Sequence, residues 1–110
     1  MDAVIQIAPA GDARADTLAV LVPEPPDGFG AGDAALRSRI AQVAADGELR
    51  GERREAVVLR VDGQRVVAAG IGVRDHVDLD ALRTAAGAAA KALARVGGSI
   101  CWLLDESLPL

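Results

Sequence analysis

The feature that most constrains this fold is a nearly continuous apolar run, residues 17–22, which ends at Pro23. A strand with one face in water alternates apolar and polar residues, whereas a strand covered on both faces does not. The run is also much shorter than the roughly 20 apolar residues needed to cross a bilayer. It therefore predicts a central strand of a layered, soluble domain, with other elements packed on both of its faces.

A β-hairpin is predicted in the middle of the chain. Residues 56–61 and 65–69 are strand-like runs, and the segment between them begins with Asp62 and Gly63. Both residue types tolerate a positive φ, so Asp-Gly between two apolar runs is a strong signal for a tight turn. The sequence Gly-Ile-Gly at residues 70–72 closes the second strand.

The first predicted helix follows Asp33, whose side chain can cap the free N–H groups of a helix N-terminus. Leu36, Ile40 and Val43 recur at spacings of four and three, which places them on one stripe. Gly47 suits the position after a helix, where a left-handed backbone is common. The pattern predicts an amphipathic helix that covers one face of the sheet.

The second predicted helix runs from Leu79 to about Val96, with Asp78 as its N-cap. Its apolar positions recur at spacings of four and three and predict a buried stripe of Leu82, Ala86, Ala89, Leu93 and Val96. The opposite, exposed face is predicted to carry Arg83, Gly87, Lys91 and Arg95.

Two more short strands are predicted, at residues 3–7 and 99–104. Residues 23–32 are predicted to be a loop, and residues 48–55 are predicted to be an exposed connection. The element order is then β-β-α-β-β-α-β. This order predicts a three-layer α/β domain, with a mixed, mostly parallel sheet of about five to six strands flanked by helices. We expect residues 1–110 to form a single domain.

Composition and charge argue against several classes of protein. The net charge is −4, whereas nucleic-acid binding draws much of its affinity from basic residues that face phosphates. The single cysteine, Cys101, excludes an internal disulfide. Residues 1–10 do not have the pattern of a signal peptide. These features predict a cytoplasmic protein that binds neither membrane nor nucleic acid.

Several segments, in order, resemble the N-terminal domain of the cytosolic leucine aminopeptidase family. The resemblance rests on Asp-Thr-Leu-Ala-Val-Leu-Val-Pro-Glu at residues 16–24 and Glu-Ala-Val-Val-Leu at residues 55–59. It continues with Arg-Val-Val-Ala-Ala-Gly-Ile-Gly at residues 65–72. The alanine-rich segment 80–93, which begins Asp-Ala-Leu-Arg-Thr-Ala-Ala-Gly, completes it. Each motif alone is rich in Ala and Gly, so the ordered set carries the resemblance.

The resemblance implies a macro-like fold and a non-catalytic role. In the family this domain precedes a catalytic domain that holds two divalent metal ions, Zn or Mn, and assembles as a hexamer. The catalytic half carries the motif Asn-Thr-Asp-Ala-Glu-Gly-Arg-Leu, and nothing like it occurs in this chain. We therefore expect no catalytic residue and no metal ligand here. The expected partner is the C-terminal catalytic domain.

Residues 70–75 are the candidate ligand-binding segment under an alternative hypothesis. Gly70, Gly72 and Asp75 follow a strand, as phosphate-binding loops do. However, a dinucleotide-binding fingerprint needs a third glycine where Asp75 stands, and a carboxylate repels phosphate. The simpler interpretation is a tight exit from the strand that needs the freedom of glycine. The alternative is a macro-like module that binds ADP-ribose or a nucleotide.

The other reactive side chains have simpler explanations. His76 is predicted to be a solvated loop residue, and Cys101 a small apolar residue of a strand. Trp102 is predicted to lie in the core or at a domain interface. The basic cluster of Arg50, Arg53 and Arg54 is interleaved with glutamates, so a solvated turn is favoured over a nucleic-acid contact. The aminopeptidase hypothesis predicts an exposed apolar patch, and the nucleotide hypothesis predicts a pocket beside residues 70–75.

Overall fold

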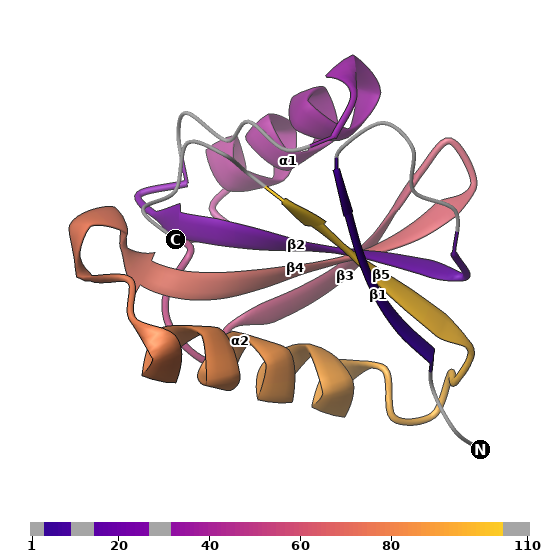
Figure 1. Cartoon of the computed structure of the whole chain (residues 1–110). Coiled ribbons are helices and arrows are strands. Elements are labelled where there is room, and N and C mark those ends of the chain that lie inside the picture. Colours follow the sequence, from indigo (N-terminus) through magenta and orange to yellow (C-terminus); the bar gives the residue numbers. More distant parts are fainter. Residues whose placement is uncertain (1–3, 10–14, 27–31, 105–110) are drawn as a thin grey trace.

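The computed structural model describes residues 4–9, 15–26 and 32–104, which form a sheet between two layers of helix (Figure 1). The five strands lie in the order β1-β5-β2-β4-β3. Only the β3–β4 pair is antiparallel, and the other pairs are parallel. The predicted three-layer α/β class, with a mixed and mostly parallel sheet, is confirmed. The elements are β1 (Val4–Pro9), β2 (Thr17–Glu24), α1 (Ala34–Ala45), β3 (Ala56–Val61), β4 (Gln64–Val73), η1 (Arg74–His76), α2 (Leu79–Ala92) and β5 (Ser99–Leu104).

The predicted hairpin joins β3 to β4. Its turn consists of Asp62 and Gly63, with φ of 50° and 83°, and the pair Val61–Gln64 closes it. Positive φ at both central residues matches the twist of the flanking strands. β4 is longer than predicted, because it continues through Gly70 and Gly72 to Val73. β2 likewise continues through Pro23, beyond a shift in register.

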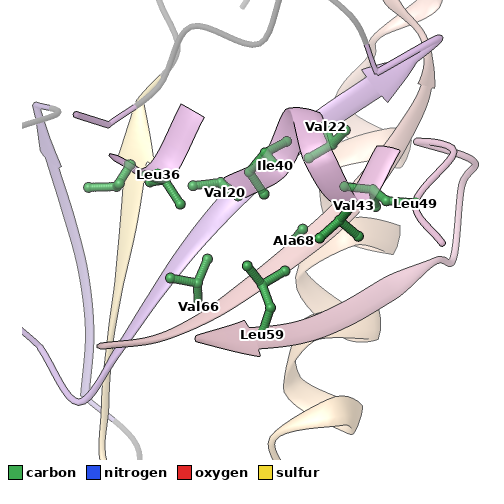
Figure 2. Close-up of a cluster of buried hydrophobic side chains, with 10 residues drawn as sticks. Val20, Val22, Leu36, Ile40, Val43, Leu49, Leu59, Val66 and Ala68 are labelled. Atoms are coloured by element: carbon green, nitrogen blue, oxygen red, sulfur yellow. The ribbon is translucent and has the colours of Figure 1, made fainter. Parts of the chain in front are cut away.

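Helix α1 covers one face of the sheet, as its stripe predicted (Figure 2). Leu36, Ile40 and Val43 are all buried against the side chains of the central strands. The Asp33 carboxylate accepts a hydrogen bond from the Leu36 N–H at 2.9 Å, and Gly47 follows the helix at φ 78°. We call this the α1-side cluster, and its other buried members are Val20, Val22, Leu49, Leu59, Val66, Ala68 and Leu103.

Helix α2 covers the opposite face through alanines (Figure 1). The predicted stripe is partly wrong, because Ala86 and Val96 are exposed and Leu82 is half-buried. The buried positions are instead Ala81, Ala85, Ala89 and Leu93. The facing positions of the sheet include Ala19 and Ala69, and small residues on both sides let the helix approach the strands closely. The other buried members of this α2-side cluster are Val67, Ile71 and Ile100.

Helix α2 also ends earlier than predicted, at Ala92 instead of near Val96. Leu93 leaves the helical conformation at φ −102° and ψ 7°, and its carbonyl accepts from the N–H groups of Val96 and Gly97. Gly97 and Gly98 then take positive φ before β5 begins. Val96 therefore lies in the turn after the helix, where its side chain is 42% exposed.

The connection between α1 and β3 is the second departure from expectation. Residues 48–55 were predicted to be exposed, but Leu49 is 1% exposed and belongs to the α1-side cluster. Gly51 is buried as well. The segment folds back over the end of the sheet because Leu49 extends the apolar surface that α1 covers. Its charged residues other than the half-buried Glu55 are exposed, which explains why composition alone suggested an exposed loop.

Candidate functional site

Residues 51–55 lie directly against the candidate segment 70–75. The Gly70 N–H donates to the Glu55 carbonyl at 2.8 Å, and the Gly72 N–H donates to the Gly51 carbonyl at 2.8 Å. A Cβ atom added at Gly70 would overlap the carbonyl oxygen of Glu52. Glycine is therefore required at position 70 because another backbone segment passes within contact distance.

The carboxylate of Glu55 fixes the shape of this connection. It accepts hydrogen bonds from the Arg50 N–H at 3.0 Å and from the Gly51 N–H at 2.7 Å. Hydrogen bonds to a charged acceptor are shorter and stronger than neutral ones. Glu55 thus stabilises the connection through its side chain and binds β4 through its backbone carbonyl.

Replacing Glu55 with alanine is expected to lower the free energy of unfolding by about 2 kcal/mol, because two backbone N–H groups lose a charged acceptor. Replacement with glutamine should cost about half as much, since a neutral amide oxygen can still accept. Urea unfolding followed by circular dichroism measures both. The control is Glu52→Ala, which removes only an exposed ion pair with Arg50 at 3.8 Å. Equal losses for Glu55→Ala and Glu52→Ala would contradict the assigned role.

Arg53 links the same connection to the start of α2. Its guanidinium donates to the His76 carbonyl at 3.1 Å and lies 3.6 Å from the carboxylates of both Asp78 and Asp80. Asp78 also caps α2, accepting from the Ala81 N–H at 2.8 Å. Arg53 is the only member of the predicted basic cluster with these contacts, since Arg50 pairs with Glu52.

The predicted ligand-binding residues occupy different environments. Gly70 and Gly72 are buried in β4, and their N–H groups are engaged with protein carbonyls. Asp75 is exposed in η1, next to the exposed His76. A phosphate at this segment would have to displace two internal hydrogen bonds. The assignment of these residues to a ligand remains a prediction.

Among the hollows on the described part of the chain are two whose walls do not include residues 70–75. The first encloses about 250 Å³ beside the start of α1, and it is lined by Leu18, Gly32, Asp33, Leu36, Val61, Asp62, Gln64, Val66 and Leu103. The second is an open depression of about 510 Å³, and it is lined by Ala15, Asp16, Arg60, Gly63, Gln64, Arg65, Val96, Gly97 and Gly98. Sequence reasoning missed both, because their walls come from segments far apart in the chain.

The remaining candidates are structural in the described part of the chain. Cys101 is 1% exposed in β5, and Trp102 packs partly buried against the α2-side cluster, as predicted. Within the described residues, no group of three or more His, Cys, Asp or Glu side chains is placed to hold a metal ion. The helices of this same part are too short or too polar to cross a bilayer.

The fold and these contacts define an α/β module. The polar contacts described above join its own segments, the α1–β3 connection to β4 and to the start of α2. The family model for the N-terminal domain of the cytosol aminopeptidase family matches residues 16–106. The chain therefore belongs to the cytosol aminopeptidase family, through its N-terminal domain. A search of curated proteins found no match.

Proposed function

We propose that this chain is the non-catalytic N-terminal domain of a cytosolic, metal-dependent leucyl aminopeptidase. The observation that carries the proposal is the family match over residues 16–106, which is most of the chain. The domain would pack on the catalytic domain, support assembly of the oligomer, and shape access to the active site. The parent enzyme would remove N-terminal amino acids from peptides.

In this proposal the two metal ions, Zn or Mn, belong to the catalytic domain. A two-metal hydrolase site needs several ligands that converge on ions about 4 Å apart. Among the described residues of this chain, no such group of side chains is brought together. The proposal places the metal ligands and the catalytic residues in the partner domain.

The connection between β4 and α2 is the surface that we assign to the catalytic domain. Val73 and Leu79 bracket this connection and are 45% and 64% exposed. Contiguous exposed apolar patches mark interaction surfaces, and we assign these two side chains to one such patch. Arg53 contacts the same connection, through a hydrogen bond to the His76 carbonyl and an ion pair with Asp78. These contacts stabilise the backbone that carries Val73 and Leu79.

Leu79→Asp tests this assignment without harming the helix, because an acidic residue is favourable in the first turn of α2. The variant is compared with wild type, each joined to or mixed with a catalytic domain of the family. We expect sedimentation to show a smaller assembly, and Mn²⁺-dependent leucine-anilide hydrolysis to fall about tenfold, as for loss of an interface anchor. Ala86→Asp, on the exposed part of α2, is the matched control.

Two outcomes would overturn the proposal. Hydrolysis by the chain alone would mean that catalytic residues lie in this domain. If the catalytic domain assembled and hydrolysed leucine-anilide equally well with and without this chain, the proposed structural role would be wrong. The nucleotide hypothesis has weaker support, because the Gly70 and Gly72 N–H groups are already engaged. Calorimetric titration with ADP-ribose is accordingly expected to give no heat of binding.

A further inference from the structure

Two arginines face each other across the β3–β4 hairpin. The register pairs Arg60 directly with Arg65, so their side chains leave the sheet on the same face. This is the α2 side of the sheet. Side chains alternate along β4, so Arg65 shares a face with Val67 and Ala69, which belong to the α2-side cluster. Like charges at directly opposed positions destabilise a sheet. The pair therefore needs an explanation other than stability.

Neither arginine is neutralised by an ion pair with a residue that the structure describes. Arg60 Nη1 donates to the Gly63 carbonyl at 2.9 Å, which leaves most of its five N–H donors free. The Arg65 guanidinium has no hydrogen bond to the described residues. Both arginines line the 510 Å³ hollow at the end of the sheet where β2, β4 and β5 begin. This is the opposite end of β4 from residues 70–75.

The negative groups near the arginines accept hydrogen bonds from other parts of the protein. Asp16 is the one carboxylate among the lining residues that the structure describes, and its Oδ2 accepts from the Ser99 N–H at 2.9 Å and lies 3.3 Å from the Ser99 hydroxyl. The C-terminal end of α2 carries a partial negative charge. Its Leu93 carbonyl accepts from the N–H groups of Val96 and Gly97. Two guanidinium groups against one carboxylate leave the described lining with a net positive charge.

We propose that this hollow binds a phosphate group, either free or carried as a monoester. Guanidinium groups match phosphate oxygens with paired N–H donors, and two of them on one face can hold one anion together. Gly63, Gly97 and Gly98 form part of the wall and have no side chains to obstruct a small anion. Binding would also relieve the repulsion between Arg60 and Arg65.

The test is titration of the ¹⁵N-labelled chain with inorganic phosphate and with glycerol 3-phosphate, against sodium chloride at equal ionic strength. The amide signals of Gly63, Gln64, Gly97 and Gly98 are expected to shift with phosphate and not with chloride. Arg60→Gln and Arg65→Gln should each weaken binding by about tenfold, the loss expected for a charge-assisted contact. Tighter binding of glycerol 3-phosphate would identify a monoester, and equal binding would identify free phosphate.

Arg83→Gln is the matched control, because Arg83 is exposed on the outer face of α2 and lies outside the lining residues. It should bind phosphate as wild type does. Arg65→Gln should keep or raise the Tm, since it removes a like-charge pair, so lost binding will not reflect unfolding. Amide signals of the hollow that do not move with either phosphate, or an Arg65→Gln variant that binds as tightly as wild type, would overturn the proposal.

Discussion

Gly70→Ala is expected to lower the free energy of unfolding by about 3 kcal/mol, a large effect for a single added methyl group. The new Cβ would overlap the carbonyl of Glu52 and crowd the backbone of Gly51. Backbone cannot rotate away as the end of a flexible side chain can. Relief of the overlap would break the hydrogen bonds from Gly70 to Glu55 and from Gly72 to Gly51.

Gly87→Ala is the control for this substitution, because it adds the same methyl group where no atom outside the local helix backbone lies within 4 Å. Gly87 is exposed in the middle of α2, so alanine should stabilise the helix there by about 0.5 kcal/mol. Urea unfolding by circular dichroism gives both values. A Gly70→Ala variant as stable as wild type would show that residues 51–55 can move away from β4 at no cost.

Leu49→Ala is expected to cost about 3 kcal/mol, as for other fully buried leucines. Leu49 is 1% exposed among Val22, Val43 and the rest of the α1-side cluster (Figure 2). Truncation would leave a cavity in the core and loosen the connection that carries Glu55. The fluorescence of Trp102, on the other face of the sheet, reports whether the whole domain unfolds in one transition.

Leu79→Ala supplies the comparison, because it makes the same truncation at a leucine that is 64% exposed. Its effect on the free energy of unfolding should stay within about 0.5 kcal/mol. If the two truncations have similar effects, Leu49 cannot be part of a closely packed core.

The parts of the fold that the sequence predicted depend on neighbours close in the chain. The α1 stripe, the Asp33 and Asp78 caps, and the Asp62-Gly63 turn are each determined within a few residues. Helix periodicity, capping and turn chemistry act locally, so one sequence is enough to recognise them. The three-layer class followed from the buried character of β2.

The parts that the sequence did not predict depend on contacts between distant segments. Leu49 lies in a charged stretch, and only the position of α1 over the sheet shows that it is core. The buried face of α2 was misplaced because small residues on the sheet favour Ala81 and Ala85 over the larger Leu82. For the site, glycine at position 70 signalled backbone freedom, whereas the structure shows a close passage of residues 51–55.

The position of β1 in the sheet has a consequence for folding kinetics. Among the described strands β1 pairs with β5 alone, so residues 4–9 take their partner from residues 99–104 (Figure 1). During synthesis the first strand therefore has no native partner until almost all of the described chain has left the ribosome. Closing a loop of that length costs entropy before any contact offsets it, and folding rates fall as contacting residues lie farther apart. The β3–β4 hairpin and the helices α1 and α2 can form earlier, and the pairing of β1 with β5 then completes the sheet.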